Sequence, residues 1–108
     1  MSAATVPETA LSPEVRSFLQ RHRAEAAFDK VCELVRECYP DRLDLTFRLL
    51  DDPDTDDRQW LVIGVVYPTS YSLDMARRQD DAYRRRLVTE VPLEYCPLFA
   101  VSSHFVGA

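Results

Sequence analysis

The sequence predicts an α+β protein: element order α-β-β-α-β, with helices packed on a three-stranded mixed sheet. Three observations predict it. Apolar residues recur at helical spacing ahead of Pro40 and Pro92, residues 42–50 alternate between apolar and polar, and two later segments have strand composition. A hairpin followed by a helical crossover to a third strand produces a mixed sheet. The length of 108 residues suits one domain, which we assign to residues 12–108, after an N-terminal tail of residues 1–11.

The segment "LSPEVRSFL" has the features of a helix start. Ser12 suits the N-cap, Pro13 suits the first turn, and Glu14 lies near the positive end of the helix dipole. The apolar stripe that follows drifts around "RHRAEA", which indicates a bend or break, and Pro40 stops the element. We therefore expect a helix over residues 13–38 that covers one face of the sheet.

Two strands are predicted next. In "RLDLTFRLL" the odd-numbered residues from Leu43 to Leu49 are apolar and point one way, whereas Asp44, Thr46 and Arg48 point the other, as in a strand with one wet face. "QWLVIGVVY", residues 59–67, is apolar on both faces, which is typical of a central strand or of one covered on its second face by a partner. Gly64 within it indicates close approach of a packed helix or a bulge.

A second helix and a third strand complete the fold. Ser70 or Ser72 can cap a helix that runs to about Glu90, and "PLFAVSSHFV" is the final strand. The apolar stripe of this helix is thin, with Asp80 at its middle. We favour the strand order 1-2-3, because the second strand is the most apolar; 2-1-3 is the alternative.

Composition bears on the protein's location. No apolar run reaches the roughly 18 residues of a membrane span, and the start has neither a basic residue before Arg16 nor the apolar core of a secretory signal. Cys32, Cys38 and Cys96 are odd in number and lack C-x-x-C spacing, as expected for reduced thiols. These features predict a cytoplasmic protein without membrane contact.

The acidic segment "DDPDTDDR", residues 51–58, raises the question of a metal site. Asp52, Asp54 and Asp56 alternate like the start of a calcium loop, but the EF-hand pattern also requires glycine at position six and glutamate at position twelve. Asp57 and Ile63 stand there instead. We therefore predict a solvated hairpin loop with no metal, and these three aspartates are the only metal candidates. With only two glycines there is no phosphate-binding loop, and no cofactor is predicted.

The arginine-rich segment "RRQDDAYRRR" raises the question of nucleic acid. Its arginines spread around the helix, and Asp80 with Arg84 and Asp81 with Arg85 form i,i+4 pairs in the favourable orientation. The net charge of −5 also argues against binding to a phosphate backbone. Because an unpaired carboxylate over a sheet is costly, we expect Asp80 to pair with Arg84, or with a neighbour such as His104 or Tyr67.

The segments "LTFRLLDDPDTDDRQWLVIGVVYPT", "SLDMARRQDDAY" and "HFV" together resemble a set of small uncharacterised bacterial proteins. These share a strand, an acidic D-P-x-x-D hairpin loop, an apolar strand, a charged helix and a short final strand. The resemblance covers roughly residues 43–106. It implies a stand-alone cytoplasmic protein with an accessory or antitoxin-like role, and it supplies no site residues.

The sequence thus favours a small noncatalytic module that acts through protein–protein contact, as a homodimer or with a larger partner. It contains no catalytic constellation, so we favour this over an enzyme. Two alternatives stay open: a metal-assisted hydrolase or nuclease that uses the loop aspartates, and nucleic-acid binding through the arginine-rich helix. The residues that we expect to take part in contact are Trp60, Asp80, Tyr83, Arg84 and Arg85.

Overall fold

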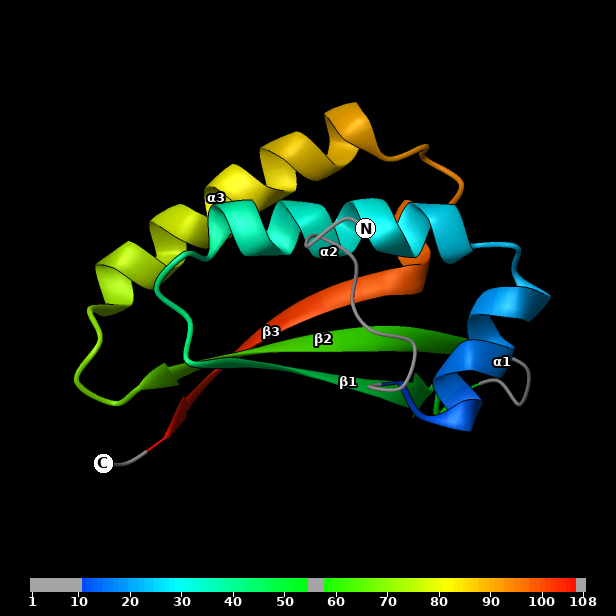
Figure 1. The fold of residues 1–108 in the computed structure, drawn as a ribbon, viewed down its shortest axis with the longest axis horizontal. Coiled ribbons are helices and arrows are strands. Elements are labelled where there is room, and N and C mark those ends of the chain that lie inside the picture. Colours follow the sequence, from blue (N-terminus) through cyan, green and yellow to red (C-terminus); the bar gives the residue numbers. More distant parts are fainter. Residues whose placement is uncertain (1–10, 55–57, 107–108) are drawn as a thin grey trace.

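The computed structural model describes residues 11–54 and 58–106. Within them the fold is α+β, with helices packed on a mixed sheet, as the sequence predicts (Figure 1). The elements are α1 (Pro13–Arg21), α2 (Glu25–Cys38), β1 (Asp44–Asp51), β2 (Gln59–Pro68), α3 (Leu73–Glu90), the short 3₁₀ turn η2 (Cys96–Leu98) and β3 (Phe99–Val106).

The predicted first helix is two helices. The Ser12 hydroxyl accepts a hydrogen bond from the Val15 N–H at 3.2 Å, which caps α1 as expected. The break falls at Arg23, which has a φ of 52°, in the left-handed region that non-glycine residues seldom enter. The next residue, Ala24, is fully buried and donates its N–H to the Leu19 carbonyl at 2.9 Å, so the turn is anchored in the core.

The sheet has the order β1-β2-β3, as predicted, with β1 antiparallel and β3 parallel to β2. Phe47 is in register with Ile63, which is in register with Val101, so the odd-numbered strand residues share one face. All three described helices lie on that side of the sheet (Figure 1).

The core lies between α2 and this face. The Phe28 side chain of α2 is 2% exposed, and its ring lies 5.6 Å from that of Phe47 and 6.1 Å from that of Phe99. Phe28 thus bridges both outer strands across β2. Four residues of β2 beneath the helices are fully buried: Leu61, Ile63, Val65 and Tyr67.

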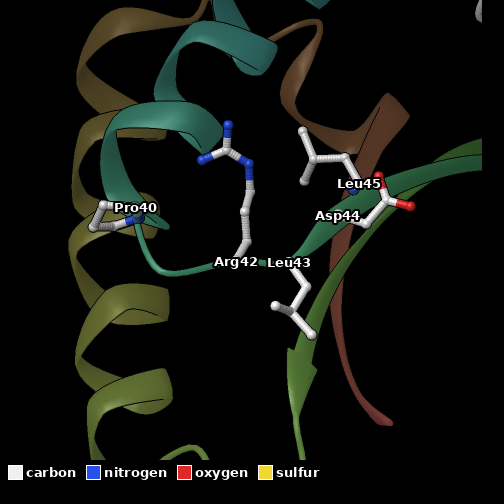
Figure 2. A pocket seen from close by; sticks show the side chains of 5 residues that line it. All are labelled: Pro40, Arg42, Leu43, Asp44 and Leu45. Carbon is white, nitrogen blue, oxygen red and sulfur yellow. Dashed lines mark hydrogen bonds between the residues drawn. The ribbon is translucent and has the colours of Figure 1, made fainter.

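The C-terminal end of α2 is capped by an arginine. Arg42 donates from Nη1 to the carbonyls of Arg36 at 3.3 Å and Tyr39 at 2.9 Å, which are among the unpaired acceptors at a helix end. Beside it a shallow hollow of about 330 Å³ is lined by Pro40, Arg42, Leu43, Asp44 and Leu45. In Figure 2 the Arg42 guanidinium lies beside the end of α2, whereas Leu43 points away from it. The Arg42 guanidinium at this hollow is therefore already hydrogen-bonded to two main-chain carbonyls of the same protein.

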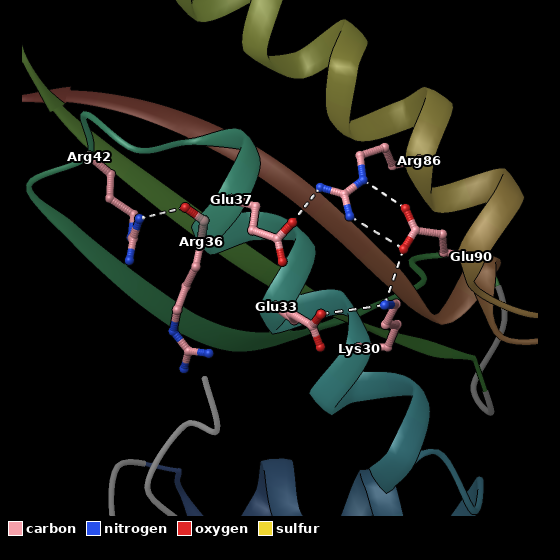
Figure 3. Close-up of polar contacts among 7 residues, drawn as sticks. All are labelled: Lys30, Glu33, Arg36, Glu37, Arg42, Arg86 and Glu90. Carbon is pink, nitrogen blue, oxygen red and sulfur yellow. Dashed lines mark hydrogen bonds and ion pairs between the residues drawn. The ribbon is translucent and has the colours of Figure 1, made fainter. Parts of the chain in front are cut away.

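Ion pairs join α3 to α2 (Figure 3). Arg86 contacts Glu90 and Glu37, each at 2.7 Å, and Lys30 contacts Glu90 at 3.1 Å. The hydrogen bond from Arg86, followed by that from Lys30, holds the pKa of Glu90 below its usual value.

The expected pairs Asp80–Arg84 and Asp81–Arg85 are wrong, since neither is formed although all four residues lie in the described part of α3. Arg84 and Arg85 are exposed, and Arg86 is the arginine that faces α2.

Replacement of Phe28 tests the core. We expect Phe28→Ala to lower the free energy of unfolding by about 3 to 5 kcal/mol, because it removes a buried ring that contacts two strands. Urea denaturation followed by circular dichroism measures it. Val88→Ala on α3, at a side chain 61% exposed, is the control and should change the stability by less than about 0.5 kcal/mol. Equal effects of the two variants would contradict this view of the core.

Candidate functional site

The second face of the sheet carries no helix among the described elements (Figure 1). We call this surface the open face. It consists of the even-numbered strand residues Asp44, Thr46, Arg48, Leu50, Trp60, Val62, Gly64, Val66, Ala100, Ser102, His104 and Val106.

The centre of the open face is apolar. Trp60 and Val66 are half-buried, and Val62 is only 4% exposed although no described helix lies above it. Val62 is in register between Arg48 and Ala100, so neighbours on the same face shield it. The prediction that residues 59–67 form a central strand is confirmed, and the second apolar face of that strand is directed outward.

Gly64 allows side chains to lie across the open face. It is in regular register with Thr46 and Ser102, so it marks no bulge, and the helices are on the other side of the sheet. A Cβ at this position would meet the Thr46 hydroxyl oxygen and, at 3.1 Å, the His104 ring. The expected helix contact or bulge is therefore wrong, and Gly64 instead leaves room for these two side chains.

Charge on the open face is sparse and balanced. Its charged side chains are the carboxylate of Asp44 and the guanidinium of Arg48, both exposed on β1, and His104 is its other titratable residue. The whole chain has a net charge of −5. A nearly neutral apolar surface on an acidic protein suits contact with another protein better than contact with a phosphate backbone.

A polar cluster lies on the helical side, at the C-terminal end of β2. The Tyr67 hydroxyl donates to Gln79 Oε1, and Gln79 Nε2 donates to the Tyr71 hydroxyl at 2.8 Å. Tyr71 in turn donates to Asp41 Oδ2 at 2.7 Å, and its ring stacks on that of Tyr67 with 4.4 Å between centroids. Gln79 is buried, and these bonds pair both ends of its amide.

Asp80 has a partner that the sequence does not indicate. The Tyr39 hydroxyl, at the end of α2, donates to Asp80 Oδ1 at 2.5 Å. Tyr39 is fully buried and Asp80 is half-buried. The expected partners Arg84, His104 and Tyr67 are wrong. The two residues that do pair are 41 positions apart, and only the packing of α3 on α2 brings them together.

The tyrosines of this region are held in the protonated form. Burial is the main cause that raises the pKa of Tyr39, Tyr67 and Tyr83, and the hydrogen bond to Asp41 is the main cause for Tyr71. At neutral pH these tyrosines are therefore not phenolate bases or nucleophiles, and the hydroxyls of Tyr39, Tyr67 and Tyr71 act as hydrogen-bond donors. The cluster joins α2, β2 and α3.

The residues expected to take part in contact do not form one surface. Trp60 belongs to the open face, whereas Arg84 and Arg85 are exposed on α3, on the other side of the sheet. Tyr83 is 4% exposed, and its ring lies 5.9 Å from that of Tyr39 between α2 and α3. The Tyr83 side chain therefore packs between the two helices. The Asp80 carboxylate is likewise engaged within the protein, by its hydrogen bond with Tyr39.

The acidic loop is described in part. Asp52 Oδ1 accepts from the Asp54 N–H at 2.9 Å, a local turn, and the Asp52 N–H donates to the Arg58 carbonyl at 2.8 Å. Asp56, the third metal candidate, lies outside the described residues. Within residues 11–54 and 58–106, no three histidine, cysteine or carboxylate side chains gather in a way that could hold a metal ion.

Two further findings bear on the class of protein. None of the helices in the described part of the chain is both long and apolar enough to cross a membrane. Comparison with protein-family models, with curated proteins and with solved structures gives no match to this chain. The described residues thus form an α+β fold in which one face of the sheet carries none of the described helices.

Replacement of Tyr39 tests the bond to Asp80. We expect Tyr39→Phe to lower the free energy of unfolding by about 1 to 3 kcal/mol, because it leaves a half-buried carboxylate without its donor. Urea denaturation measures this cost. Tyr95→Phe removes a hydroxyl from a half-buried tyrosine outside the cluster and should have a smaller effect. A loss no greater than that of Tyr95→Phe would refute the role of this bond.

The raised tyrosine pKa values predict a loss of stability in alkali. In the unfolded chain tyrosines ionise near pH 10, whereas Tyr39, Tyr67, Tyr71 and Tyr83 stay protonated to higher pH when folded. Stability should therefore be full below about pH 10 and fall as the pH rises towards the raised values. Denaturation midpoints measured across this range, with tyrosinate absorbance recorded in parallel, test the prediction. A stability that stays flat well above pH 10 would contradict it.

Proposed function

We propose that this chain is a small noncatalytic protein-interaction module whose contact surface is the open face. One observation carries the proposal. The central strand directs Trp60, Val62 and Val66 away from the helices, onto a face that no described helix covers. Apolar area that is removed from water stabilises a complex by roughly 25 cal/mol per Å², and tryptophan is among the residues that contribute most to interfaces.

The polar groups support a noncatalytic role. The amide of Gln79 and the carboxylate of Asp80 are each engaged by tyrosine hydroxyls, and those tyrosines have raised pKa values. Groups that are engaged in this way stabilise the position of α3 and are not poised for proton transfer. This arrangement favours a binding protein over the alternative of a hydrolase.

We also propose that the module acts in the cytoplasm. Cys32 and Cys38 are buried free thiols, and burial raises the pKa of Cys32 to about 12, which keeps it in the thiol form. Unpaired buried cysteines suit a reducing compartment.

Site-specific photo-crosslinking in cells tests the contact surface. A photoreactive amino acid at Val66 or at Ala100, both half-buried on the open face, should give a covalent product with a partner protein. The same amino acid at Val88 of α3, which is 61% exposed, is the control and should give much less. The mass of the product distinguishes a second copy from another protein. Equal products from all three positions, or none from the open face, would refute the proposal.

A further inference from the structure

We propose that two copies of this chain pair through the outer edge of β1, antiparallel and with Thr46 at the two-fold axis. This goes beyond the proposed function, because the contact is the edge of β1 and not the open face. In this register Asp44 of each copy lies opposite Arg48 of the other.

The hydrogen-bond alternation of β1 determines which main-chain groups are free. Asp52 is in register with Arg58 and donates its N–H to the Arg58 carbonyl. In an antiparallel pair, alternate residues direct both main-chain groups to the partner strand. The even-numbered residues from 44 to 52 therefore bond to β2. Leu45, Phe47 and Leu49 direct their N–H and carbonyl groups to the outer edge, where no described strand lies. Helix α1 packs near the Leu49 end of β1, so the part of the edge around Thr46 is the part that a second strand would occupy.

One of these outward groups is held by a side chain. The Leu45 N–H donates to Asp44 Oδ1 at 2.8 Å. A second β1 strand would supply the Phe47 carbonyl to this N–H in place of the carboxylate. Asp44 would then be released towards the guanidinium of Arg48 of the second copy. Pairing thus exchanges a local hydrogen bond for a main-chain bond and an ion pair.

The charges select one register. Pairing about Thr46 places Asp44 opposite Arg48 twice, once on each side of the axis, because a two-fold interface repeats every contact. Pairing about Phe47 would place Asp44 opposite Leu50. Pairing about Arg48 would bring two guanidinium groups together, which is unfavourable. β3, the other edge of the sheet, carries only His104 as a titratable side chain and offers no such pair of charges.

The apolar side chains of β1 agree with this register. On the helical side, half-buried Leu45 would lie opposite Phe47 of the second copy. Both copies would direct their helices to the same side, and their open faces would join into one surface across six strands.

A charge-swap cycle tests the pairing. Asp44→Arg and Arg48→Asp each create two like-charge contacts, so each should weaken the dimer about tenfold or more in sedimentation equilibrium. The double variant Asp44→Arg/Arg48→Asp restores opposite charges and should recover an affinity close to that of the natural chain. Both side chains are exposed, so neither change disturbs the core. A double variant as weak as the single variants, or a natural chain that stays monomeric at millimolar concentration, would overturn the inference.

A disulfide tests the register directly. Across a non-hydrogen-bonded antiparallel pair the Cα atoms lie about 4.5 Å apart, within the range that a disulfide spans. Thr46→Cys, in a Cys96→Ser background, should therefore give a covalent dimer on mild oxidation. Ser102→Cys, on β3 of the same face, is the matched control and should stay monomeric. Oxidised dimer from Ser102→Cys but not from Thr46→Cys would overturn edge pairing in favour of stacked open faces.

The experiments distinguish contact through the open face from pairing through the edge of β1. Photo-crosslinks from Val66 and Ala100 to another protein, with no coupling between Asp44 and Arg48, would refute edge pairing and leave the proposed function standing. A dimer that obeys the charge swap, with no crosslink from the open face, would keep the pairing and refute the open face as a contact surface.

Discussion

Burial of β2 beneath α2 determines where every other element of this protein lies. The inward residues of β2 are completely removed from water, and Phe28 extends the contact to both neighbouring strands. Because a strand alternates its side chains, the remaining apolar residues of β2 must point the other way. The helices of the described chain gather over the first face, which places Trp60 and its neighbours at the surface. A well-packed core on one side and an apolar face that no described helix covers on the other are thus two results of one strand that is apolar on both sides.

Helix α3 shows how a helix with few apolar residues can still be positioned accurately. Its inward side combines Ala76 and Tyr83 with two polar residues, Gln79 and Asp80, each bound to a tyrosine of another element. Directional bonds of this kind restrict the angle and depth at which a helix packs, whereas apolar contacts alone tolerate sliding. The ion pairs of Arg86 and Lys30 act at the other end of the α2–α3 interface. The thin apolar stripe of α3 is therefore complemented by specific polar contacts.

Local patterns account for most of what could be predicted. The caps at Ser12 and Ser72, the helix break ahead of Glu25 and the central place of β2 depend on neighbouring residues or on hydrophobic periodicity. The pairing of Tyr39 with Asp80 and the choice of Arg86 over Arg84 depend on how α3 is rotated against α2, which no local pattern encodes. The apolar residues that β2 contributes to the open face could be predicted, because residues 59–67 are apolar on both sides of the strand. That β1 carries opposite charges on an edge strand, with no described strand beyond it, follows only from the observed strand order and register.

The crossover from β2 to β3 has a consequence for synthesis on the ribosome. The β1–β2 hairpin closes over a short connection, so it can form while the rest of the chain is still being made. β3 is separated from β2 by residues 69–98 and becomes available only after these residues have been translated. During that interval the most apolar strand of the protein has one row of main-chain groups without a partner, at a stage when nascent chains are prone to aggregate. The interval between the synthesis of β2 and that of β3 is therefore the stage at which this fold is most exposed to aggregation.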